Sequence, residues 1–174
     1  MVGRLVVMLI CWSTIGYGQF VGDTNWETEE DFRSVEAEVV EDILWLEANP
    51  FASEANDTKA ISGYVLEWVT NTPYISVTNE TVFTESFVSK KYKYSEKLRV
   101  TYLFGKTLYA IENQEDPDEV QASKRGIEGM VQVYEELLRV DKKAQKRELN
   151  FYQQLIETDR LEGYVVDELK AAGS

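Results

Sequence analysis

Residues 95–113 read SEKLRVTYLFGKTLYAIEN, and the apolar residues of this stretch decide the fold. They recur at spacings of three and four but point to several sides of the predicted helix: Leu98, Tyr102, Leu103, Phe104, Leu108 and Ile111. A helix that is apolar nearly all round is buried by other helices, so we expect this one, capped by Ser95, at the centre of the core. Gly105 lies in mid-helix, where glycine costs about 1 kcal/mol relative to alanine. A close crossing against Gly126 and Gly129 would offset that cost.

The segments on both sides show the same helical periodicity. One helix is expected from a cap at Thr28 to a stop at Pro50, and others over about 53–71, 82–88, 117–140, 147–156 and 158–169. Asp116 is expected to cap the helix that follows it. Only residues 74–77 alternate like a strand. The sequence therefore predicts an all-α fold, an irregular bundle of five to six helices with at most one short extended segment.

Residues 1–18 have the pattern of a secretory signal peptide. Arg4 precedes an apolar run over 5–12, and Gly16 and Gly18 suit a signal peptidase that cleaves before Gln19. The alternative is a buried N-terminal helix or strand, and the run is too short for a membrane span. We therefore expect residues 19–174 to form a single helical domain that is exported to a periplasmic or secreted location. Cys11 is the only cysteine and follows Ile10 rather than a small residue, so we expect no lipid anchor and no disulfide.

The chain is strongly acidic. It has 18 Lys and Arg against 31 Asp and Glu, a formal net charge of -13. Such a charge repels phosphate backbones and anionic lipid surfaces, so a nucleic-acid partner is not expected. One local exception is a basic run, Lys142-Lys143 followed by Lys146-Arg147, which stands between two predicted helices.

The chain has no histidine, which removes Ser-His and Cys-His catalytic pairs and the usual zinc sites. Its glycines are scattered rather than gathered in a phosphate-binding loop, and the residues after Asp116 do not follow the spacing of a calcium loop. We therefore assign no catalytic residue, no metal site and no cofactor. Glu38 with Glu41 or Asp42 could form an acid/base pair or, alternatively, a solvated acidic face.

Aromatic side chains are the better candidates for a binding site. Tyr64 and Trp68 share one predicted helix face, and Tyr102 lies on another. Such residues either line a pocket for a small apolar ligand or peptide, or they belong to the core. Asn56 and Asn79 each begin an N-glycosylation pattern, which matters only in a eukaryotic secretory pathway.

Several stretches resemble a group of small exported helical proteins of Bacteroidota whose function is uncharacterised. They span most of the expected mature chain: residues 42–50, 64–73, 102–110, 126–143 and 161–165. The resemblance implies export and a helical fold, and it transfers no functional residue.

Three hypotheses for the function follow from the sequence. The first is an exported, non-enzymatic binding or interaction module, with an unknown protein or a small apolar ligand as its partner. The second is an enzyme that uses carboxylate and tyrosine groups in a cleft between helices. The third is a structural or stress-protective protein, which a smooth charged surface would favour over an apolar groove.

Overall fold

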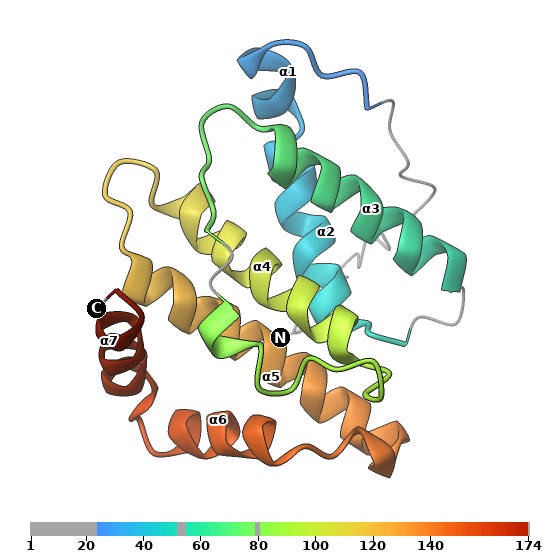
Figure 1. Ribbon diagram of the computed structural model, residues 1–174. Helices are drawn as coiled ribbons and strands as arrows, with labels where there is room; N and C mark the ends of the chain where they lie inside the picture. The colour runs from blue at the N-terminus through green and yellow to red at the C-terminus, as the bar shows by residue number, and fades with distance from the viewer. Residues whose placement is uncertain (1–23, 52–54, 79–80, 174) are drawn as a thin grey trace, which may run out of the picture.

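The computed structural model of the protein describes residues 24–51, 55–78 and 81–173 (Figure 1). The predicted signal peptide and Asn79 itself lie outside these ranges. The described residues form seven α-helices and two 3-10 helices: α1 (Glu29–Ser34), α2 (Glu36–Ala48), α3 (Ala55–Asn71), η1 (Thr81–Phe83), α4 (Ser95–Glu112), α5 (Glu119–Val140), η2 (Lys142–Ala144), α6 (Arg147–Glu157) and α7 (Leu161–Ala172). No strand occurs among them. The predicted all-α fold is confirmed.

Helix α4 lies between two hydrophobic cores. Leu98 and Tyr102 on α4 belong to a C-terminal core, which is built mainly from α5, α6 and α7. Phe104 and Leu108, further along the same helix, belong to an N-terminal core built from α1, α2 and α3. The prediction that the helix over 96–113 is central is therefore confirmed, because its side chains enter both cores.

The predicted glycine crossing forms between α4 and α5. A Cβ atom on Gly105 would lie 2.7 Å from the carbonyl oxygen of Arg125 and 2.8 Å from the Cα of Gly126. Only the missing side chains at Gly105 and Gly126 allow the two backbones to come this close. Gly129 has another role, because a Cβ there would lie 2.1 Å from a carboxylate oxygen of Glu47.

Gly129 makes room for an ion pair between α2 and α5. The guanidinium of Arg125 donates two hydrogen bonds to the Glu47 carboxylate, at 3.0 and 2.7 Å. The Glu47 residue is 3% exposed. A buried carboxylate needs such a bidentate partner, because an unpaired charge in the core is strongly destabilising. The pair therefore fixes the position of α2 against α5.

The single helix predicted from Thr28 to Pro50 is divided into α1 and α2 at Val35. The start is as predicted, since Thr28 and Asp31 form a reciprocal capping box. The backbone of Val35 then leaves helical geometry, with φ -108° and ψ 0°. The hydroxyl of Ser34 donates a hydrogen bond to the Asp31 carbonyl at 2.7 Å, which competes with the regular helix pattern.

Two predicted caps are wrong. Helix α4 begins at Ser95 itself, and the Ser95 hydroxyl bonds back to the preceding loop, where it donates to the Ser89 carbonyl at 2.9 Å. Asp118, not Asp116, caps α5 by accepting hydrogen bonds from the N–H groups of Val120 and Gln121. In both cases several polar residues stand before the helix, and the loop path selects the one that caps it.

The segment between α3 and α4 is less regular than predicted. The described residues of 74–77 belong to no strand, although Ile75 is buried in the N-terminal core. The helix expected over 82–88 is reduced to the single turn of η1, which is followed by hydrogen-bonded turns. Phe83 and Phe87 are nevertheless buried in the C-terminal core, as their apolar character requires.

Candidate functional site

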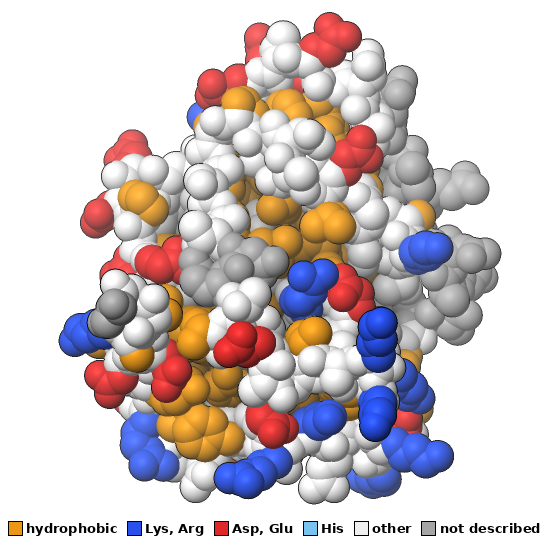
Figure 2. Space-filling view, in the orientation of Figure 1, with side chains coloured by type: hydrophobic (Ala, Val, Ile, Leu, Met, Phe, Trp, Pro, Cys, Tyr) orange, Lys and Arg blue, Asp and Glu red, His pale blue; other side chains and the backbone are white. Residues whose placement is uncertain are grey.

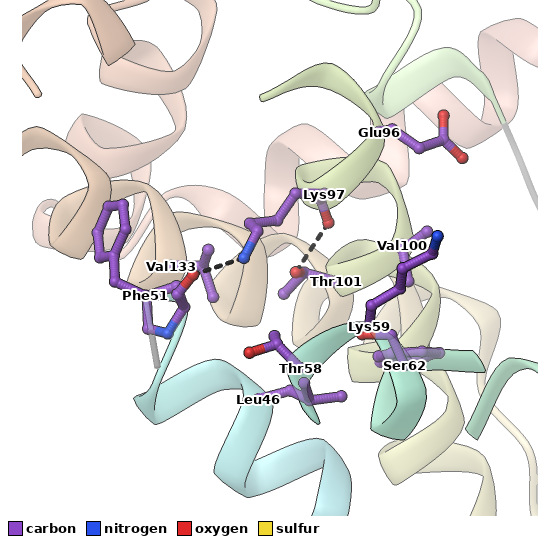
Figure 3. A pocket seen from close by; sticks show the side chains of 12 residues that line it. Leu46, Phe51, Thr58, Lys59, Ser62, Glu96, Lys97, Val100, Thr101 and Val133 are labelled. Atoms are coloured by element: carbon purple, nitrogen blue, oxygen red, sulfur yellow. Dashed lines mark hydrogen bonds between the residues drawn. The ribbon is translucent and has the colours of Figure 1, made fainter. Parts of the chain in front are cut away.

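A pocket of about 550 Å³ opens at the junction of α2, α3 and α4 (Figure 3). Its volume lies within the usual range for small-molecule sites. Half of the lining side chains are apolar: Leu46, Pro50, Phe51, Val100, Phe104 and Val133. The other half are polar: Thr58, Lys59, Ser62, Glu96, Lys97 and Thr101.

The pocket exists because α2 stops just before Pro50. The Asn49 backbone N–H and side-chain amide both donate to the Trp45 carbonyl, at 2.9 Å each, which closes the last turn of α2. The chain then leaves the helix, and Phe51 remains 40% exposed. The ends of α2 and α3 therefore face the first turns of α4 across an open space with a largely apolar wall.

Lys97 is the principal polar group of the pocket. Its ammonium donates a hydrogen bond to the Pro50 carbonyl at 2.5 Å, and Figure 3 shows the side chain reaching across toward Phe51 and Val133. Within the described residues Lys97 forms no ion pair. Burial lowers the pKa of Lys97, since a desolvated ammonium is less stable than a hydrated one.

The charges around the pocket favour an anion. Among the side chains that the structure describes here, Glu96 is the only acid in the lining, and Arg99 pairs with its carboxylate at 2.7 Å. The lining also contains two cations, Lys97 and the exposed Lys59. An anionic group beside Lys97 would offset the cost of burying its ammonium. The arrangement is therefore suited to a molecule with an apolar body and one negative group.

The aromatic residues predicted as ligand contacts lie in the two cores. Tyr64 and Trp68 are 4% and 0% exposed in the N-terminal core, where the Trp68 ring N–H donates to the Phe32 carbonyl at 3.1 Å. Tyr102 is 0% exposed in the C-terminal core, and its hydroxyl donates to Ser123 at 3.3 Å. The structure does not bring Tyr102 together with the other two, and none of the three lines the pocket. Ligand binding by these residues remains a prediction.

The pocket residues were missed at the sequence level for a local reason. Lys97 follows Glu96 in the sequence, and a charged pair of this kind is typical of a solvated helix face. The available signal is its spacing: Lys97, Thr101 and Phe104 fall on one stripe of α4 that mixes polar and apolar groups.

The acidic group on α2 is partly desolvated. Burial raises the pKa of Asp42 to about 6, with further contributions from Glu38 and Glu41. Burial also raises the pKa of Glu38 and, to about 12, that of Tyr64, which faces both carboxylates. One oxygen of Glu38 and one of Asp42 are buried without a hydrogen-bond partner among the described residues. Of these groups, Asp42 could exchange a proton near neutral pH.

The described ranges offer no group of three or more Asp, Glu or Cys residues that could hold a metal ion. Across the same ranges, no helix has the length and apolar character needed to cross a membrane.

Comparison with known proteins adds no assignment to this geometry. No family model, no curated protein and no solved structure matches the chain.

Proposed function

We propose that the protein is a non-enzymatic binding module whose pocket takes a small, mostly apolar molecule with one anionic group. The observation that carries this proposal is the position of Lys97 in a pocket with an apolar wall and one already paired acid. The apolar wall would bury the body of the ligand, and the ammonium would hold its negative group. An open apolar pocket also supports binding over a purely structural or stress-protective role.

Two fluorescent probes test the pocket. Anilinonaphthalene sulfonate has an apolar body and one negative charge, whereas N-phenylnaphthylamine has a similar body without the charge. Both should bind the folded protein, and Ser62→Phe, which fills the pocket from α3, should abolish the binding of both. Lys97→Met should weaken the sulfonate at least about 10-fold and leave the neutral probe nearly unchanged.

Lys124→Met is the matched control, since Lys124 is half-buried on α5 and pairs with Glu162 outside the pocket. Circular dichroism must show that each variant is folded, because such probes also bind loosened proteins. Unchanged sulfonate binding in both Ser62→Phe and Lys97→Met would overturn the proposal.

A second candidate, a carboxylate and tyrosine enzyme, is favoured by one observation. Asp42, with its pKa of about 6, lies near Glu38 and Tyr64. An acid of this kind could donate or accept a proton near neutral pH. Turnover of chromogenic aryl glycosides or esters that disappears in Asp42→Asn but persists in Ser62→Phe would favour the enzyme. The absence of any turnover would leave the binding module as the better account.

We further propose that the protein acts outside the cytoplasm, and that it belongs with the exported helical proteins of Bacteroidota that it resembles. Arg4, the apolar run over 5–12 and the small residues Gly16 and Gly18 support export. Intact-mass measurement of the secreted or periplasmic protein should find a chain that starts at or near Gln19. A chain outside the cytoplasm that retains Met1 would contradict the predicted signal peptide.

A further inference from the structure

Two segments that are far apart in the sequence form one basic corner of the molecule. They are residues 88–94, which lead into α4, and residues 140–147, which join α5 to α6. The Tyr92 hydroxyl donates to the Ala144 carbonyl at 2.7 Å, the Tyr94 hydroxyl donates to Asp141 at 2.8 Å, and Lys93 pairs with Asp141 at 2.7 Å. We call this surface the basic corner: Lys90, Lys91, Lys93, Lys142, Lys143, Lys146 and Arg147.

The basic corner opposes the charge of the rest of the chain. Its two segments contain seven cations and a single acid, Asp141, which is a formal charge of +6. Because the whole chain carries -13, the remainder carries -19. Figure 2 shows several blue side chains close together at the lower right, whereas the upper part of this face carries mainly acidic side chains.

This segregation changes what net charge implies about partners. The sequence-level expectation of repulsion from anionic surfaces treats the charge as evenly mixed. At physiological ionic strength the screening length is about 8 Å, so a surface that touches the basic corner interacts mainly with that corner. The acidic remainder would then orient the molecule with the corner toward an anionic surface.

The cations of the corner are accessible. Lys90, Lys91, Lys142 and Lys143 are exposed, and none of the four forms an ion pair within the described residues. Val140, at the end of α5, is 70% exposed directly beside them, and Val88 at the other end of the corner is 39% exposed. The corner thus combines unpaired lysines with apolar side chains.

These features select among anionic partners. A single-stranded nucleic acid needs exposed aromatic rings for its bases, but Tyr92 is 6% exposed and its ring lies 4.7 Å from the Lys146 ammonium. The half-buried Tyr94 ring lies 4.6 Å from the Lys93 ammonium, which covers one of its faces. In Figure 1 the two segments lie near each other at the lower right of the fold, where α5 ends. Lysines beside an exposed valine suit the boundary between anionic headgroups and acyl chains.

We propose that the basic corner docks the protein onto an anionic lipid bilayer. This inference uses residues outside the pocket and goes beyond the proposed binding function. The two sites are nevertheless near each other in the chain, because Lys97 of the pocket follows the 88–94 segment in the first turn of α4. A docked molecule would hold the pocket close to a source of amphiphilic anions.

Vesicle co-sedimentation tests the docking. The full chain should bind vesicles of phosphatidylcholine with about 30% phosphatidylglycerol more tightly than pure phosphatidylcholine vesicles, and the difference should shrink as salt rises. Any contribution of the apolar run over 5–12 is common to both kinds of vesicle, and any contribution of Arg4 is common to the wild type and its variants. Lys142→Gln with Lys143→Gln should reduce the affinity for anionic vesicles about 30-fold, at roughly 1 kcal/mol per lysine.

The matched control is Arg160→Gln with Lys170→Gln, which removes the same charge from exposed positions outside the corner. It should leave vesicle binding nearly unchanged, and Ser62→Phe should do the same, so a failure of the pocket proposal would not affect this result. Equal losses in the two double variants, or no preference for anionic vesicles at low salt, would overturn the proposal. Binding to single-stranded DNA or self-association, without vesicle binding, would also overturn it.

Discussion

Asp42 shows how a single residue can work against the stability of this fold. It lies on the partly buried side of α2, where burial and neighbouring carboxylates raise its pKa to about 6 from an ordinary 3.8. The native state therefore binds a proton more readily than the unfolded chain does. Above about pH 6 the ionised carboxylate destabilises the protein, and this cost is relieved as the pH falls from about 6 toward 4.

Asp42→Asn should therefore raise the free energy of unfolding at pH 7, and it should have little effect near pH 4. The wild type should gain stability between pH 7 and pH 5, because Asp42 takes up a proton in that interval. Asp141 does not cancel this gain. Hydrogen bonds, the largest from Lys93, lower its pKa to about 2, so its contribution is lost only below that interval.

Urea unfolding at pH 7 and pH 5 checks this prediction. Asp167→Asn on the exposed face of α7 is the control. It should not appreciably change the free energy of unfolding at pH 7 or at pH 5. A loss of stability in Asp42→Asn at pH 7 would show that the ionised carboxylate has a favourable partner.

At the scale of the elements, the close crossing of α4 and α5 depends on Gly105 and Gly126, which have a hydrogen in place of a side chain. Gly105 meets the backbone of Arg125 and Gly126 at distances that no Cβ tolerates. Gly163, in contrast, lies in α7 with nothing within 4 Å of where its Cβ would be. Replacing each of the two glycines by alanine therefore separates the effect of packing on stability from the effect of helix propensity.

Gly105→Ala should lower the free energy of unfolding by about 1–3 kcal/mol or more, because the rigid backbone of α5 must move away. Gly163→Ala should raise it by up to about 1 kcal/mol, because alanine is the better helix former and fits without a clash. Denaturant unfolding of both variants measures the two changes in the free energy of unfolding. If Gly105→Ala raised the free energy of unfolding as Gly163→Ala does, α4 and α5 could move apart at the crossing without cost.

At the scale of the whole molecule, α4 links the two cores. It contributes Leu98 and Tyr102 to one core, and Phe104 and Leu108 to the other. If one core opened alone, α4 would lose its packing on that side, so we expect the two to unfold together. Of the four tryptophans, Trp68 is buried in the N-terminal core, Trp26 and Trp45 pack against it, and Trp12 lies outside the described residues.

Tryptophan fluorescence therefore reports mainly on the N-terminal core, whereas circular dichroism reports on all helices. Leu149→Ala in the C-terminal core and Leu108→Ala in the N-terminal core should each cost about 2–5 kcal/mol, since both leucines are buried. Each variant should shift the fluorescence and dichroism midpoints by the same amount. Glu136→Ala, at the end of α5, should cost far less. A fluorescence midpoint that Leu149→Ala leaves unchanged would mean that the cores unfold independently.

The sequence by itself determined the helical class, the central helix and the close approach of Gly105 to Gly126. These features depend on local rules: spacings of three and four residues, and the absence of a side chain at glycine. The expected ends of helices were less accurate, because Ser95, Asp116 and Asp118 are equally good candidates by local chemistry, and only the path of the loop decides among them.

Only the tertiary structure decided where the pocket and the basic corner lie. Lys97 meets the Pro50 carbonyl and Tyr94 meets Asp141 across 47 residues of sequence in each case. Helical periodicity says which face of one helix is apolar, but it does not say which other helix covers that face or where a gap remains. For the same reason, the tyrosines and tryptophan that the sequence offered as ligand contacts lie in the cores, and Lys97, which no sequence motif marks, lines the pocket.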